Sequence, residues 1–486
     1  MTGTANKLGA TRVVAEAIAK VTYQDLPADV VEAIKKSIID TLGVTLAATT
    51  LGGDGGSVAE LVREWGGREE ATILGFGGRV PVYGAVFAFG ALAHQLDYDD
   101  VLGGGVVHPT APTLSAALPM AERLGGVTGK EMIAAVALGN EMMIRLSRCV
   151  TTDLWGLGWL QPSLFGGFSA GTAAGKLLKL DADQLVDMLG LTMHQAGGTL
   201  ESAYNPGSSW RGLRDGFAAK AGVTAALLAE RGVPGDKQAL EGKYGLLNLH
   251  LGGKCDPTIL LEDFGETFSA ARVGYKMWPS CAFTHGYLTA VSECVRRNGL
   301  VPDDIARITL SLGKGGEAWV EPREFRVKPT TSMDAKWSLP FLLGKMVQRG
   351  QVGLEDFTSS GLNDSAAHAI AQRVDWKIDP SLPTAGTGPG VVSISTRDGR
   401  TLSQRSEYSL GHPENPVTWD DLISKFKDCC RHSVHPLGDA EAQRIVDLVR
   451  NIEDMRDVGE LLRRVSANGQ AGQRPAERSK SVAHSI

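Results

Sequence analysis

Hydrophobic positions recur at helical spacing from about residue 12 to residue 250. Pro27 suits the first turn of a helix, and after it apolar side chains repeat every three or four positions. A later segment opens with Thr128 and Glu131, the spacing of a capping box, and continues in apolar residues. This half therefore predicts a set of helices, with others expected over 164–178, 182–196 and 211–232 and one short strand candidate at 71–77.

The pattern changes near residue 270. Residues 306–313 and 390–410 alternate between apolar and polar as strands do, and the second stretch contains an Asp-Gly pair typical of a hairpin. Helices are expected between these strands, over 334–350 and 364–374, and again over 417–431 and 438–465. We therefore predict a mainly α protein. Its large all-helical domain is predicted to combine residues 1–269 and 406–465, with an α+β lid domain of residues 270–405 inserted between them. The polar tail, residues 466–486, is predicted to be disordered.

The composition indicates a folded protein that binds neither nucleic acid nor membranes. Of its 486 residues, 43% are hydrophobic and 21% charged, and a chain of formal net charge -6 lacks the basic patches that bind polyanions. At this length two domains are the ordinary expectation. The six cysteines show no CxxC pair, and neither a signal peptide nor a membrane span is recognisable, so we expect a cytoplasmic protein. The 60 glycines suit either closely packed helices or the bias of a GC-rich genome.

A first polar island, HQLDYDDVLGGGVVHPTAP (94–112), interrupts the apolar background. A carboxylate between buried flanks must be paired, hydrogen-bonded or shifted in pKa. Three interpretations stay open. The acids cap backbone groups while His108 hydrogen-bonds to a carbonyl; or Asp97, Asp99 and His108 bind a metal ion; or His108, tuned by Asp97, transfers protons.

Two further islands carry cations. In GYKMWPSCAFTHG (274–286), Lys276 binds a carboxylate or acts as a base, unless it is a surface lysine with a buried stem. In NPGSSWRGLRDGFAAKAG (205–222), Arg211 and Arg214 enter an alanine-rich helix, as a carboxylate clamp or as halves of structural ion pairs. Motifs for nucleotide or flavin binding, for a serine nucleophile elbow and for a zinc protease are absent, so no cofactor and no metal is predicted.

Taken in order, these islands resemble motifs of the MmgE/PrpD family, which includes 2-methylcitrate dehydratase, cis-aconitate decarboxylase and iminodisuccinate epimerase. The resemblance rests on GALAHQLDYDDVLGGGVVHPTAP, WRGLRDGFAAKAGVTAALLAERG with LEGKYGLLNLH, YKMWPSCAFTHG and SMDAKWSLPFLLGKMV, and it extends over about 30–465. It implies a helical domain made from both ends of the chain, an inserted α+β lid, a homodimer, no organic cofactor, and a site between the helical domain and the lid.

The resemblance also assigns residues. Asp97 and His108 in the first island and Lys276 in the second match the catalytic groups of the family. Three positions that are expected to contact substrate differ: Arg211 replaces a lysine, Val101 a threonine and Phe341 a tyrosine. Arginine keeps the positive charge but cannot act as a neutral amine base, and phenylalanine lacks a phenol that could donate a proton.

These assignments predict a lyase of the decarboxylase or dehydratase type, acting on a small carboxylic acid. Arg211 and Lys276 would hold carboxylate oxygens of the substrate, while His108, positioned by Asp97, moves a proton at the neighbouring carbon. An isomerase or epimerase of a dicarboxylic acid needs the same groups without a leaving group. A non-catalytic carboxylate-binding homologue is the third alternative, which the three substitutions favour.

Overall fold

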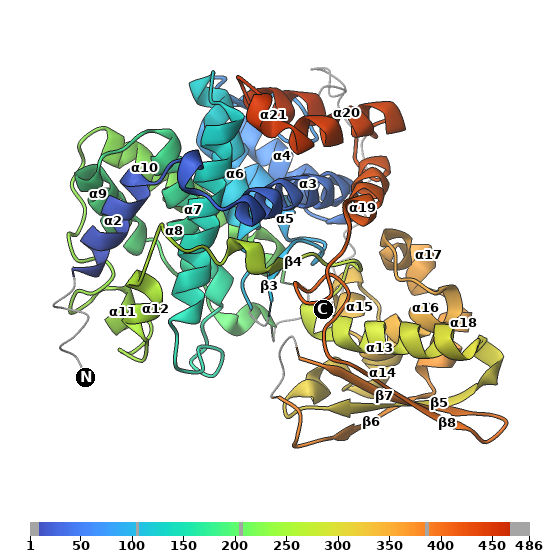
Figure 1. Ribbon diagram of the computed structural model, residues 1–486. Coiled ribbons are helices and arrows are strands. Elements are labelled where there is room, and N and C mark those ends of the chain that lie inside the picture. The colour runs from blue at the N-terminus through green and yellow to red at the C-terminus, as the bar shows by residue number, and fades with distance from the viewer. Residues whose placement is uncertain (1–8, 104–105, 204–207, 384–387, 467–486) are drawn as a thin grey trace, which may run out of the picture.

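The computed structural model describes residues 9–103, 106–203, 208–383 and 388–466. It is mainly α, as predicted, and most of its helices form one large body that contains both ends of the described chain (Figure 1). The helices of this body that precede residue 270 are α2 (Ala10–Lys20), α3 (Ala28–Leu51), α4 (Gly55–Glu64), α5 (Val82–Ala93), α6 (Thr110–Leu124), α7 (Gly129–Arg148), α8 (Gln161–Leu177), α9 (Ala182–Met193), α10 (Trp210–Glu230), α11 (Leu246–Leu249) and α12 (Pro257–Leu261). Those that follow residue 410 are α19 (Trp419–Arg431), α20 (Asp439–Arg450) and α21 (Gly459–Val465).

Local sequence signals set where the long helices begin. Helix α3 starts directly after Pro27, and its apolar face is buried. The capping box of α7 is confirmed, because Thr128 Oγ1 accepts the N–H of Glu131 at 3.3 Å and the Glu131 carboxylate accepts the N–H of Thr128 at 2.9 Å. The strand candidate at 71–77 is much shorter than expected: only β1 (Ala71–Thr72) forms, paired with β2 (Arg79–Val80).

A second hydrophobic core is made by residues between Trp278 and Ile394. It includes one face of a four-stranded sheet of order β6-β5-β7-β8, which lies at the lower right in Figure 1. The strands are β5 (Ile305–Leu312), β6 (Val374–Ile378), β7 (Gly390–Thr396) and β8 (Thr401–Ser406). The helices of this part are α13 (Ala282–Asn298), which packs on β7 and β8, with α14 (Arg323–Val327), α15 (Ser332–Lys336), α16 (Leu339–Arg349), α17 (Ser359–Leu362) and α18 (Ser365–Ala371).

Three helices that apolar periodicity predicts as continuous are divided or shortened in the structure. Residues 334–350 form α15 and α16 because Ser338 caps the second helix, its Oγ accepting the N–H of Phe341 at 3.1 Å. The helix expected over 364–374 ends at Ala371, and the chain turns into β6, an unpredicted strand that runs parallel to β5. Residues 438–465 likewise form two helices, α20 and α21.

The expected hairpin is confirmed, and the expected tail is mostly outside the described residues. Strands β7 and β8 pair antiparallel around Gly399, whose φ of 90° suits a residue without a side chain. Of the segment 466–486, only Ser466 is described; it is buried, and its Oγ accepts the N–H of Gly75 at 3.0 Å. Among the described helices, none combines the length and the apolar composition that crossing a membrane requires.

Glycines allow helices distant in the sequence to pack closely. Helix α19, from the end of the chain, lies on α3, where a Cβ added to Gly43 would meet the ring of Phe426 at 3.0 Å. Helix α5 lies on α10 with even less space, since a Cβ on Gly216 would come within 2.6 Å of the carbonyl oxygen of Phe87. At these positions the glycines serve close helix packing.

The contact between α5 and α10 should therefore be sensitive to a single methyl group. We expect Gly216→Ala to lower the free energy of unfolding by about 1–3 kcal/mol, because backbone atoms cannot move aside as a flexible side chain can. The matched control is Gly56→Ala in α4, where an added Cβ meets no atom within 4 Å. This control should be neutral or stabilising by up to about 1 kcal/mol. Chemical denaturation of both variants measures the difference, and equal stabilities would contradict the close packing.

Candidate active site

Two backbone contacts bring the three polar islands together. Strand β3 (Val101–Leu102) in the first island pairs antiparallel with β4 (Val273–Gly274) at the start of the second. The packing of α5 on α10 brings the first island, which follows α5, to the start of the third, where a Cβ on Gly212 would lie 2.8 Å from Gln95. Side chains more than 100 residues apart in the sequence thus meet at one place.

Asp97 occupies the centre of this meeting point. Its side chain is 1% exposed, Lys276 Nζ lies 2.5 Å from its Oδ1, and Arg211 Nη2 lies 2.8 Å from its Oδ2. Lys276 Nζ also donates to the Asp97 carbonyl oxygen at 2.9 Å, which holds a residue whose φ of 50° is unusual outside glycine. Burial alone would raise the pKa of Asp97, but the charges of Lys276 and Arg211 outweigh it and hold the pKa well below its ordinary value.

A second buried lysine supports this arrangement from the end of the chain. Lys425 on α19 donates to Asp40 Oδ1 at 2.7 Å, to the carbonyl oxygen of Tyr98 at 2.7 Å and to that of Lys276 at 2.8 Å. Both carbonyls belong to residues of the site or adjacent to it. The C-terminal helices therefore help to fix the backbone on which Asp97 and Lys276 stand.

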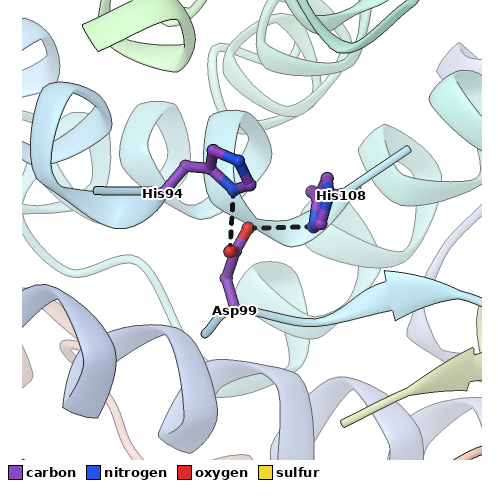
Figure 2. Close-up of side chains that lie close together, drawn as sticks. All are labelled: His94, Asp99 and His108. Carbon is purple, nitrogen blue, oxygen red and sulfur yellow. Dashed lines mark hydrogen bonds and ion pairs between the residues drawn. The ribbon is translucent and has the colours of Figure 1, made fainter. Parts of the chain in front are cut away.

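His94, Asp99 and His108 form a separate group, in which both imidazoles face one carboxylate (Figure 2). His94 Nδ1 lies 2.8 Å from Asp99 Oδ1, and His108 Nδ1 lies 3.3 Å from Asp99 Oδ2, so the two imidazoles hold one carboxylate between them. Burial would raise the pKa of Asp99, but the two histidines more than offset this and keep it well below its ordinary value. Because an ionised carboxylate only accepts hydrogen bonds, His94 Nδ1 must carry a proton.

The position of the proton on His108 follows from its other partner. Its Nδ1 lies 2.7 Å from the carbonyl oxygen of Asp100, which can only accept. In neutral His108 the proton is therefore on Nδ1 and the lone pair is on Nε2. No described residue hydrogen-bonds to Nε2, and the His108 side chain is 8% exposed to solvent. This nitrogen is therefore available to a bound molecule.

His94, Asp99 and His108 also have the residue types of a metal site, with ligand atoms within 4.8 Å of one another. Both Nδ1 atoms carry protons that are used in hydrogen bonds, so a cation here would have to bind the Nε2 atoms or displace a proton from Nδ1. We interpret the group as a proton-holding network. The metal hypothesis for the first island also named Asp97, which lies instead between Lys276 and Arg211.

Burial decides between the interpretations that the sequence left open for the cations. Lys276 is 2% exposed in its side chain and ion-paired, so it is not a surface lysine. Arg211 and Arg214 both take part in ion pairs, Arg211 with Asp97 and Arg214 with Asp215 at 3.3 Å. Arg211 nevertheless keeps an unpaired buried Nε and 13% of its side-chain exposure.

Asp97, Val101 and Phe341, which were predicted as site residues, lie in three different surroundings. Asp97 was expected to position His108, but Asp99 and the Asp100 carbonyl do so, because the turn after α5 directs Asp97 toward the cations. Val101 lines a small hollow that also contacts Lys276. Phe341 is fully buried in the second core, where its ring meets those of Phe357 and His368.

Several residues of the site were not singled out from the sequence. They are His94, His285, Lys336 and Lys425, all buried and all but Lys425 inside segments that carried the family resemblance. His285 lines the same hollow as Val101, and burial together with the charge of Lys276 lowers its pKa to about 3, so it is neutral. The one available signal was a titratable side chain within an otherwise apolar run, which does not reveal its partner.

Asp100 differs in protonation from its neighbours. Its carboxyl group is bonded only to Thr110, through the Thr110 N–H at 3.3 Å and the Thr110 hydroxyl. Burial, which these hydrogen bonds only partly offset, and the nearby charges of Asp99 and Asp40 raise its pKa from 3.8 to about 8. At neutral pH the native protein therefore keeps Asp100 protonated.

Two family models match this chain. The model of the MmgE/PrpD N-terminal domain matches residues 12–257, and that of the MmgE/PrpD C-terminal domain matches residues 278–454. The chain belongs to the MmgE/PrpD family. In this MmgE/PrpD protein, Lys276 and β4 lie in the segment that connects the two matched ranges.

Curated relatives cover nearly the whole chain. Human cis-aconitate decarboxylase is 25% identical over 452 residues, which is 89% of this chain and 89% of the human protein. Cis-aconitate decarboxylase of Aspergillus terreus is 23% identical over 478 residues, which is 94% of this chain and 96% of the fungal protein. The mouse enzyme of the same name is 25% identical over 454 residues, with 88% of each chain covered. This MmgE/PrpD protein is accordingly an enzyme of the family type.

The protonation of Asp100 predicts how stability depends on pH. Between about pH 4 and pH 8 the native carboxyl keeps a proton that the unfolded chain releases, so raising the pH through this window lowers the free energy of unfolding. In Asp100→Asn, a neutral amide replaces the acid, and this contribution should disappear. The difference between wild-type and variant stability, measured by urea unfolding from pH 4 to 8, should fall with rising pH. The exposed Asp303→Asn serves as control, and a flat difference for Asp100→Asn would refute the assignment.

Proposed function

We propose that this protein is a lyase that removes carbon dioxide or water from a small carboxylic acid, by moving a proton at the carbon beside a carboxylate and without an organic cofactor. The observation that carries the proposal is that His108, whose Nε2 has no partner among the described residues, lies close enough to Asp97 and its two buried cations to act on Asp97 electrostatically. The names of the relatives, cis-aconitate decarboxylases, agree with this reaction class.

His108 has the surroundings that a general base needs. The hydrogen bond from Nδ1 to the Asp100 carbonyl fixes the ring, and the ionised Asp99 at 3.3 Å stabilises the imidazolium that forms when Nε2 takes a proton. His94 holds the other oxygen of Asp99, so the carboxylate does not rotate away. The same imidazolium can return its proton to carbon or to a leaving group.

Arg211 and Lys276 supply the positive charge for the substrate. Asp97 occupies only Nη2 of Arg211, so that Nη1 and Nε still have donors to offer a carboxylate. Fixed positive charges beside the carbon that loses the proton stabilise the negative charge that develops there. One such contact commonly lowers the barrier by about 3 kcal/mol. Because Arg211 stays charged at all relevant pH values, its role is binding and not proton transfer.

The other expectations about partners and location stay predictions. They are a homodimer, a cytoplasmic location, and the absence of nucleic-acid and membrane partners.

The reaction class can be tested without knowing the substrate. We expect the protein, incubated with cis-aconitate, citrate, malate and fumarate in deuterated water, to convert at least one acid into a new product seen by proton NMR. Deuterium exchange without net conversion would show an isomerase instead. The absence of both exchange and conversion with all four acids would favour a binding protein.

The role of His108 can be tested with an isosteric amide. In His108→Asn the side-chain amide can still donate to the Asp100 carbonyl, but no basic nitrogen remains, so turnover should fall by about 100- to 10,000-fold with an unchanged melting temperature. Lys276→Ala should reduce turnover by at least about 100-fold through loss of the fixed charge. His194→Gln, at an exposed site, is the control for general effects of removing a histidine. Full turnover in both His108→Asn and Lys276→Ala would exclude this site.

A further inference from the structure

Lys336 is a buried lysine without an anionic partner. Among the described residues four lysines are buried, and three of them form ion pairs: Lys276 with Asp97, Lys345 with Asp356 and Asp364, and Lys425 with Asp40. Lys336, at the end of α15, is 2% exposed, and no carboxylate of a described residue lies within 4.0 Å of its Nζ. Its amine has a single hydrogen bond, to the carbonyl oxygen of Gln95 at 3.2 Å.

Lys336 lies in the cluster around Asp97, although it comes from the other hydrophobic core. Gln95, which accepts its hydrogen bond, is two positions before Asp97 in the same turn. The next residue, Trp337, has the guanidinium of Arg211 over its ring at 4.4 Å. The charges of Asp97, Arg211 and Lys276 all act on the Lys336 amine.

The cluster therefore has more positive than negative charge. The charges that act on Lys336 are those of two cations, Arg211 and Lys276, and of one carboxylate, Asp97, which the two cations already bind. Burial lowers the pKa of Lys336 to about 8, with Arg211 and Lys276 lowering it and Asp97 opposing them. A buried ammonium without a counter-ion is costly to a folded protein, and among the described residues the amine has one hydrogen-bond acceptor and the face of the Phe357 ring, 5.6 Å from Nζ, in place of an anion.

We propose that Lys336 binds a second carboxylate of the substrate and so selects acids with two or more carboxylates over acids with one. This inference rests on the proposed function, since it assumes that Arg211 and Lys276 bind the first carboxylate. The bound anion then supplies the partner that the amine lacks, and the charge balance of the site is completed only in the complex.

Binding of an unreactive probe tests this role. Tricarballylate carries three carboxylates and no double bond, and propionate carries one carboxylate. In calorimetric titrations at pH 7 we expect Lys336→Gln and Lys336→Met to weaken tricarballylate binding by about 10- to 100-fold, the usual effect of losing a hydrogen bond to a charged group. Propionate affinity should change little. Lys336→Gln keeps an amide that can donate to Gln95, so its folding does not depend on the missing ammonium.

Melting temperatures without ligand separate a binding role from a structural one. Lys336→Gln and Lys336→Met should melt at the wild-type temperature or above it, because they remove an unpaired buried charge. The matched control is Lys345→Gln, which should melt several degrees lower because it leaves Asp356 and Asp364 without their lysine.

Different results would overturn the role of Lys336 and the proposed function. Wild-type affinity for tricarballylate in both Lys336 variants, or a loss of melting temperature as large as that of Lys345→Gln, would overturn the role of Lys336 and leave the proposed function standing. If the wild-type protein binds neither probe and converts no acid of the panel, the proposed function fails and this inference fails with it.

Discussion

The site depends on one buried carboxylate, that of Asp97, held between Lys276 and Arg211. Removing three charged groups from water carries a large desolvation penalty, which is offset only when the charges meet at close range and make further hydrogen bonds. Here the cations come from different islands, so the ion pairs also fix the islands to one another. Loss of the carboxylate would leave two buried positive charges in mutual repulsion, a change that costs about 3–5 kcal/mol in comparable ion pairs.

The rest of the fold can be understood as support for this contact. The glycines between α5 and α10 bring the turn that carries Asp97 within reach of Arg211. The pairing of β3 with β4 brings Lys276 to the same place, and Lys425 holds two backbone carbonyls beside it. Because these supports come from both ends of the chain, the complete site includes the packing of α19 on α3.

Three neighbouring aspartates have different roles because their surroundings differ. Asp97 is ionised between two cations, Asp99 is ionised between two imidazoles, and Asp100 is protonated because burial and its acidic neighbours outweigh its bonds to Thr110. Environment, more than residue type, thus assigns each carboxyl its part. Some buried polar atoms nearby, including His94 Nε2 and Arg214 Nη2, have no hydrogen-bond partner among the described residues. Such costs are tolerated where binding a ligand or moving a proton requires them.

The amino-acid sequence by itself determined the mainly helical class, the starts of α3 and α7, the β7–β8 hairpin and the polar islands. These features are local, since capping, turn chemistry and periodicity act over a few residues. Only the tertiary structure decided that His108 pairs with Asp99 and not with Asp97, that β6 lies parallel to β5, and that Lys336 lies in the cluster. Partner choice depends on the direction in which a tight turn sends each side chain and on contacts between residues far apart in the chain. The spacing of residues along the chain carries no record of either.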